Sequence, residues 1–321
     1  MLARIAFALA LPSAALAGPV VERIKADNVI RCGGVSRPGL VTQSPDGLKA
    51  AGLYLDLCRA IGAALLGPGG RIEFHPYDSD KSFERVRRGA DDLFFVDGSE
   101  ILDHGLAGHL TLGPAIYFVA LAAMAPGDSS IRGLKDLAGK RVCFYQGDNA
   151  HRRLEAWMAA HGLDFVRMGY MEYGELYDAY NARVCEAEVG EAGDLAVARL
   201  SDKGRPLASR IVPEALATFP IFAATPASDP QWSAIVAWAI YALQRAELPA
   251  TLWAASGADS MPVAGRELGL PDDWRARVVG AAGSYADLYA RNLGERSRLN
   301  LPRGPNAPAE AGGLFVMPYR E

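Results

Sequence analysis

The sequence predicts an α/β fold with two lobes, each a doubly wound sheet, and two observations support this prediction. Short apolar runs alternate with amphipathic stretches, and the whole alternation occurs twice along the 321 residues. Long apolar runs at 115–126 and 214–225 flank the second occurrence. Two extended crossings around an inserted α/β unit are typical of two lobes that are joined by hinge strands.

The first set of elements begins with a strand at 28–35 that ends in glycines. Residues 53–67 then place apolar side chains at helical spacing, and Gly67 favours a helix end there. A strand at 71–77, a short helix at 80–89 and a strand at 91–96 complete the first set. This β-α-β-α-β order is that of a doubly wound sheet.

The second set repeats the pattern further along the chain. Its predicted strands are 141–146, 164–170 and 183–189, and its predicted helices are 150–162, 173–182 and 192–202. Residues 228–321 are predicted to be mostly helical, with the strongest helical periodicity at 230–248.

Residues 1–17 have the pattern of a secretory signal peptide. Arg4 supplies the positive charge, residues 5–14 form a short apolar core, and small residues at 15–17 predict cleavage after Ala17. A membrane anchor is the alternative, but it needs roughly 20 apolar residues in one run. We therefore expect an exported protein. Its formal net charge of −4 argues against nucleic acid as a main partner, because phosphate binding needs a concentrated basic surface.

The chain has four cysteines, Cys32, Cys58, Cys143 and Cys185. An even number in an exported chain predicts two disulfides, and four cysteines allow three pairings. The sequence separations favour Cys32 with Cys58 and Cys143 with Cys185, each bridge worth roughly 3–4 kcal/mol on the loop-entropy model. No two cysteines have the CxxC spacing of a zinc site, and we expect neither a metal nor a cofactor.

Four stretches of the chain resemble solute-binding protein family 3, the substrate-binding proteins of polar amino-acid ABC transporters. They are "ERIKADNVIRCGGVS", "GLYLDLCRAIGAALLG", "LKDLAGKRVCFYQGD" and "DDWRARVVGAAGSYADLYARNLGERSRLNLPRG". The likeness is greatest to the general L-amino-acid-binding branch and extends from about residue 20 to the end. All four cysteines stand at positions that this branch uses for two disulfides, each within one lobe.

The resemblance implies a type II periplasmic binding protein, with lobe 1 formed by 18–120 and 222–321 and lobe 2 by 121–221. In such proteins a small polar solute binds in the cleft between the lobes and is delivered to an ABC permease at the inner membrane. The resemblance therefore implies a periplasmic monomer that is not an enzyme. In α/β sheets, ligands bind beyond the carboxyl ends of the strands, and the candidate site residues all follow strands. They are Arg37, Asp97, Ser99, His104, Asp148, Asn149 and Glu191.

This sequence departs from the family pattern at several of these positions. Ser99 keeps a hydroxyl position, and Glu191 aligns with the aspartate that holds the ligand ammonium. Asp97 falls where a small polar residue is usual, and Asp148 and Asn149 stand where the family has two threonines. These changes make the cleft more acidic than that of ordinary amino-acid binders.

The arginine that grips the ligand carboxylate aligns with His104, and an imidazole cannot form that bidentate fork. Carboxylates at Asp97, Glu100, Asp148 and Glu191 would also repel a free carboxylate. We therefore expect weak or absent binding of ordinary amino acids and a bias toward cationic or metal-bearing solutes. Two alternatives stay open: Arg37 could restore carboxylate binding, and Asp97 with Glu100 could form a helix capping box instead of a ligand site.

Two other functions compete with solute capture. A catalytic derivative of the scaffold, similar to the dehydratases among its relatives, would use a cleft carboxylate as an acid. An accessory protein that has lost its ligand would be left with a degenerate pocket. The sequence names neither the ligand nor the partner.

Overall fold

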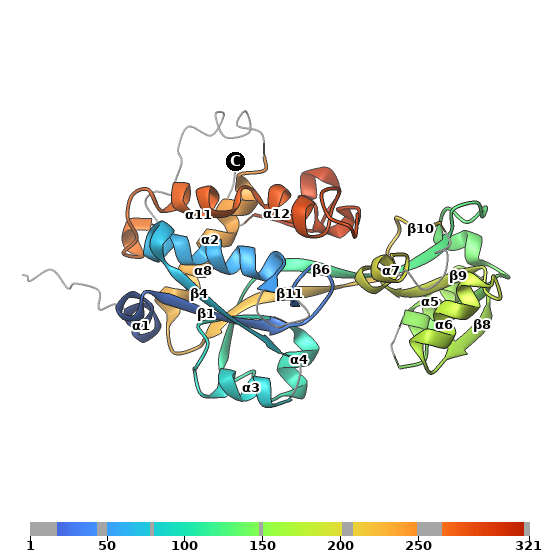
Figure 1. Cartoon of the computed structure of the whole chain (residues 1–321), viewed down its shortest axis with the longest axis horizontal. Coiled ribbons are helices and arrows are strands. Elements are labelled where there is room, and N and C mark those ends of the chain that lie inside the picture. The colour runs from blue at the N-terminus through green and yellow to red at the C-terminus, as the bar shows by residue number, and fades with distance from the viewer. Residues whose placement is uncertain are drawn as a thin grey trace, which may run out of the picture.

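The computed structural model describes residues 18–43, 50–77, 80–147, 150–200, 208–248 and 265–317. The predicted signal peptide and two candidate site residues, Asp148 and Asn149, lie outside these ranges. Figure 1 shows two α/β lobes that are connected by two long strands, so the predicted fold class is confirmed.

One sheet of nine strands runs through both lobes. Its order is β4-β1-β5-β11-β6-β9-β7-β8, with β10 paired to β6. The strands are β1 Val29–Val35, β4 Arg71–Tyr77, β5 Leu93–Asp97, β6 Leu110–Pro126, β7 Arg141–Tyr145, β8 Val166–Tyr170, β9 Ala187–Glu191, β10 Ser209–Ile211 and β11 Ala217–Pro226; a separate pair is β2 Thr42–Gln43 with β3 Ala50–Ala51.

The two long strands, β6 and β11, join the lobes. They pair with each other in antiparallel fashion from Leu110 and Pro226 to Leu121 and Ala217. β11 also pairs with β5 in the first lobe, and β6 pairs with β9 in the second lobe. Each lobe therefore has its own parallel strands, but backbone hydrogen bonds continue from one lobe to the other.

The first lobe carries the helices α1 Pro19–Asp27, α2 Leu53–Leu66, α3 Asp80–Arg87, α4 Gly98–Asp103, α8 Pro230–Arg245, α11 Trp274–Ala282 and α12 Tyr285–Asn292. Helix α2 ends where the sequence predicts, because Gly67 takes a φ of 69° that side chains rarely adopt. Trp274 and Tyr285 are fully buried in the same core as Leu57 and Ile61 of α2. The C-terminal helices thus return to the first lobe, as Figure 1 shows.

The second lobe carries α5 Ala150–Ala160, α6 Tyr173–Asn181 and α7 Ala192–Ala198. Phe144 on β7 and Leu154 and Met158 on α5 belong to a core cluster of this lobe. Short 3-10 turns complete the described elements: η1 Gly67–Gly69, η2 Leu134–Leu137, η3 Gly304–Asn306 and η4 Ala309–Ala311. No helix among the described residues is long and apolar enough to cross a membrane.

Both predicted disulfides are confirmed. Cys32 on β1 pairs with Cys58 on α2, with 6.4 Å between their Cα atoms. Cys143 on β7 pairs with Cys185, with 5.7 Å between their Cα atoms. Each bridge joins a strand to a neighbouring segment of the same lobe, so neither restricts motion between the lobes.

Candidate functional site

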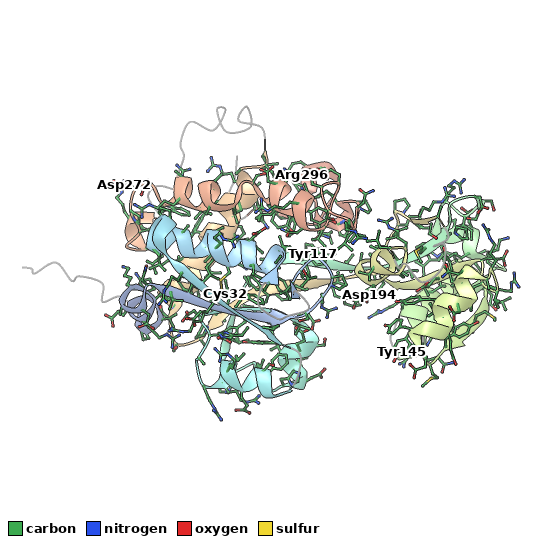
Figure 2. The ribbon with its side chains drawn as sticks, viewed as in Figure 1. Cys32, Tyr117, Tyr145, Asp194, Asp272 and Arg296 are labelled. Carbon is green, nitrogen blue, oxygen red and sulfur yellow. A yellow bond between two sulfur atoms is a disulfide. The ribbon has the colours of Figure 1, made fainter. Side chains whose placement is uncertain are left out.

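A cavity of about 490 Å³ is lined by residues of both lobes and of the two connecting strands. The charged and polar lining residues are Arg37, Asp97, Ser99, Arg153 and Glu191, and the others are Gly98, Val119, Leu121, Phe219, Pro220 and Phe222. Tyr117 on β6 and Asp194 on α7 mark the region where the two lobes meet in Figure 2. The cavity therefore has charged walls, and its apolar surface comes from β6 and β11.

The loop after β1 places Arg37 in this cavity. Strand β1 passes closely against a buried aromatic ring, since a Cβ on Gly34 would lie 2.9 Å from the Tyr54 ring. The chain then turns, and the Arg37 carbonyl accepts hydrogen bonds from the backbone amides of Leu40 and Val41, each at 3.1 Å. This turn holds the Arg37 backbone in place at the carboxyl end of the strand.

The Arg37 guanidinium binds three carboxylates at once. Its Nη1 donates to both carboxylate oxygens of Glu191, at 2.8 and 2.9 Å. Its Nη2 donates to Asp97 Oδ2 at 3.1 Å and lies 3.6 Å from Glu100 Oε1. Burial disfavours the charged guanidinium, but Glu191 and Glu100 outweigh this and raise the pKa of Arg37 above its ordinary value. Arg37 therefore stays charged, and both of its terminal nitrogens are engaged.

Helix α4 begins at the first-lobe wall of the cavity with a capping box. Asp97 Oδ1 accepts hydrogen bonds from the Glu100 amide at 3.0 Å and from the Ser99 hydroxyl at 2.6 Å. Glu100 Oε2 accepts a hydrogen bond from the Asp97 amide at 2.8 Å. The capping-box alternative for Asp97 is thus realised, and its other oxygen binds Arg37. A contact between Asp97 and a ligand stays a prediction.

Glu100 lies behind this wall and is the carboxylate with the most altered acidity. Burial and the nearby Asp97 carboxylate raise its pKa to about 7, although the Asp97 amide and Arg37 act in the opposite direction. Near neutral pH this group is therefore partly protonated. The three carboxylates around Arg37 consequently carry less negative charge than their number indicates.

The described part of the second lobe contributes one acidic and one basic side chain to the cavity. Glu191 ends β9 and precedes α7, at the carboxyl end of its strand. Arg153 is on the first turns of α5, and its guanidinium carbon lies 5.6 Å from the centre of the Phe219 ring. Among the described residues, the lining therefore includes two arginines as well as two carboxylates, so positive charge offsets the carboxylates there.

The structure separates His104 from the other candidate residues. His104 follows α4, its ring stacks on Phe83 with 3.7 Å between ring centres, and it is not among the cavity-lining residues. Its carbonyl accepts a hydrogen bond from Arg87 at 2.8 Å. Because the helix carries this side chain toward α3, His104 does not stand in the cavity in place of an arginine.

The sequence-based reasoning missed Arg153 and the apolar surface from the connecting strands. A signal for Arg153 was present, because it lies in the first turns of a helix that follows a strand end. Phe219 and Phe222 sit in a run that the sequence assigns to a hinge, and nothing in that run distinguishes a wall of the cavity from core packing.

Comparisons with known proteins agree with the two-lobed fold. No protein-family model matches the chain. It is 25% identical over 326 residues to the general L-amino acid-binding periplasmic protein AapJ of Rhizobium johnstonii, covering 97% of this chain and 95% of the relative. It is also 25% identical over 330 residues to the glutamate/glutamine/aspartate/asparagine-binding protein BztA of Rhodobacter capsulatus, covering 96% and 95%.

A solved structure shares the fold over nearly the whole chain. It is an ABC transporter periplasmic binding protein from Brucella ovis with glutathione bound, with a TM-score of 0.66 and 23% identity. The match covers 92% of this chain and 97% of that one. Two α/β lobes joined by long strands thus define the fold of a periplasmic solute-binding protein. The full-length relatives make the chain a homologue of the periplasmic binding proteins of amino-acid ABC transporters, so the resemblance seen in the sequence is confirmed.

Proposed function

We propose that this chain is the periplasmic receptor of an ABC-type uptake system and captures a small polar solute in the cavity between its lobes. The observation that carries the proposal is the cavity itself, which both lobes and both connecting strands line. We further propose that lobe 1 comprises 18–120 and 222–321, that lobe 2 comprises 121–221, and that cleavage follows Ala17. The homologues are named as binding proteins, which supports the expectation that the chain is not an enzyme.

The proposed ligand is amino-acid-like, but an ordinary L-amino acid binds weakly. The ion pairs of Arg37 support weak binding of ordinary amino acids, because its guanidinium is already bound by Glu191, Asp97 and Glu100. A ligand carboxylate would have to compete with three protein carboxylates for that fork. A ligand ammonium group would bind Glu191 by displacing Arg37. The proposal therefore includes ligands that carry a positively charged group.

The test is a thermal-shift screen of the wild-type protein, followed by calorimetric titration of each hit. We expect a polar solute other than the common neutral amino acids to raise the melting temperature. A ligand at a hundredfold excess over its dissociation constant stabilises the folded state by roughly 2.7 kcal/mol, which such a screen detects. Micromolar affinity for alanine or leucine would show that the argument from Arg37 is wrong.

One observation favours a ligand-free accessory protein as the second candidate. Arg37 connects the two lobes through Glu191 with the protein's own charges. A screen in which no amino acid, peptide, carboxylate or amine shifts the melting temperature would support that role and contradict the receptor.

A further inference from the structure

The cavity contains two guanidinium groups, and they differ in their surroundings. Arg37 is bound by three carboxylates, as described above. Arg153 is exposed on α5, and within the described ranges its guanidinium lies over the face of the Phe219 ring. Glu155, two positions further along the helix, lies on another side of it and pairs with Arg167. Arg153 is thus the cavity arginine whose hydrogen-bond donors face no protein carboxylate in the described structure.

The surface next to Arg153 is apolar. Phe219 lies beneath its guanidinium, and Pro220 and Phe222 follow on the same strand. Val119 and Leu121 of β6 also line the cavity. An arginine held over an aromatic ring beside apolar side chains is well placed for a carboxylate, because its planar fork can donate two hydrogen bonds while the ring keeps it in position.

We propose that Arg153 is the anion-binding residue of this cavity, and that the ligand is a carboxylate-bearing solute, other than an ordinary L-amino acid, with an apolar body. This inference rests on the proposed function and specifies its ligand class. The carboxylate binds to the second lobe through Arg153, and the apolar body lies against Phe219 and Phe222. A polyamine or a hydrated metal ion lacks the group that Arg153 binds.

The experiment uses matched probes in calorimetric and thermal-shift titrations. Hydrocinnamate is compared with phenylpropylamine, and δ-aminovalerate with cadaverine, so that each pair differs in the charge of one end group. The variants are Arg153→Gln and Arg153→Lys, with Arg152→Gln as the control. Arg152 is the exposed neighbour on the same helix and does not line the cavity.

We expect the wild type to bind a carboxylate probe better than the matched amine. Arg153→Gln should weaken that binding by about tenfold or more, as is usual for the loss of a charge-assisted hydrogen bond. Arg153→Lys should restore part of the affinity, and Arg152→Gln should leave it unchanged. Melting temperatures of the ligand-free variants within a degree or so of one another would exclude a folding defect, because Arg153 is exposed.

Three results would overturn the inference. They are equal carboxylate affinity in Arg153→Gln and wild type, a preference for the amines, and equal losses in the Arg152 and Arg153 variants. In each of these cases the receptor function would stand, since the protein still binds a solute. If the wild type binds neither carboxylate probe, the inference fails as well. If the broader screen of amino acids and peptides also finds nothing, the receptor function fails with it.

Discussion

At the scale of single residues, Arg37 determines the chemistry of the first-lobe wall. One guanidinium balances Glu191, Asp97 and Glu100, and the side chains of Asp97 and Glu100 are only 13% and 14% exposed. Three carboxylates that share one cation cannot all ionise easily in such a place. Glu100, the most affected of them, has its pKa raised to about 7.

The first prediction concerns the pH dependence that follows from Glu100. Its pKa is higher in the folded state than in the unfolded chain, so the folded protein binds the proton more tightly between about pH 4.5 and 7. Its contribution to the free energy of unfolding should therefore fall by up to about 3 kcal/mol as the pH rises through this range. Glu100→Gln should remove this part of the pH dependence in urea unfolding.

The control for this measurement is Glu175→Gln, which changes an exposed glutamate on α6. Its stability profile should run parallel to that of the wild type between pH 5 and 8. If Glu100→Gln also runs parallel to the wild type, Glu100 does not titrate near neutrality.

At the scale of secondary-structure elements, a single buried carboxylate caps two helices. Asp229 precedes α8, and its Oδ1 accepts a hydrogen bond from the Trp232 amide at 2.9 Å. Its Oδ2 accepts hydrogen bonds from the amides of Val20 and Val21 in the first turn of α1, at 2.8 and 3.1 Å. Asp229 is completely buried, so it links the N-terminal helix to the C-terminal half of the first lobe.

The second prediction is that Asp229→Ala destabilises the protein by about 3 kcal/mol or more. The change leaves three buried amides without their acceptor, and buried unsatisfied donors cost about 1–3 kcal/mol each. Ser284→Ala is the matched comparison, because Ser284 caps α12 at an exposed site and should cost about 1 kcal/mol. Chemical denaturation measures both, and equal losses would contradict the role of Asp229 as a double cap.

At the scale of the whole molecule, two kinds of contact oppose separation of the lobes. The continuous sheet ties them through β6 and β11. Among the described residues, polar side-chain contacts add to this where Arg37 binds Glu191 and where Arg199, just after α7, donates to the carbonyls of Leu299 and Asn300. Strands β6 and β11 can bend without losing their backbone hydrogen bonds. The side-chain contacts between the lobes, in contrast, must break when the lobes move apart.

The third prediction is that Glu191→Gln increases the average separation of the lobes in the ligand-free protein. Loss of a partly exposed ion pair is worth about 1 kcal/mol, which changes a two-state population roughly fivefold. Small-angle X-ray scattering should show a larger radius of gyration than for the wild type. Asp128→Asn is the control, since its partner Arg183 belongs to the same lobe. An unchanged radius in Glu191→Gln would show that this pair does not hold the lobes together.

The sequence by itself determined the alternation of strands and helices and the fold class. Helix and strand periodicities are local properties, so the end of α2 at Gly67 and the alternation of strands and helices could be predicted from neighbouring residues. The pairing of Cys32 with Cys58 followed from separation and resemblance together.

Only the tertiary structure decided which charges meet in the cavity. Arg37 and Glu191 are 154 positions apart in the chain and yet form an ion pair, while His104, which is close to Asp97 in sequence, is not among the cavity-lining residues. A side chain at the end of a short helix can point to either side of it, and the direction depends on what packs there, here Phe83. Arg153 is a candidate ligand-binding residue because β11 places Phe219 beneath its guanidinium, and only the tertiary structure shows this contact. Charge pairs between loops of different lobes depend on how the lobes are placed, and no local pattern in the sequence carries that information.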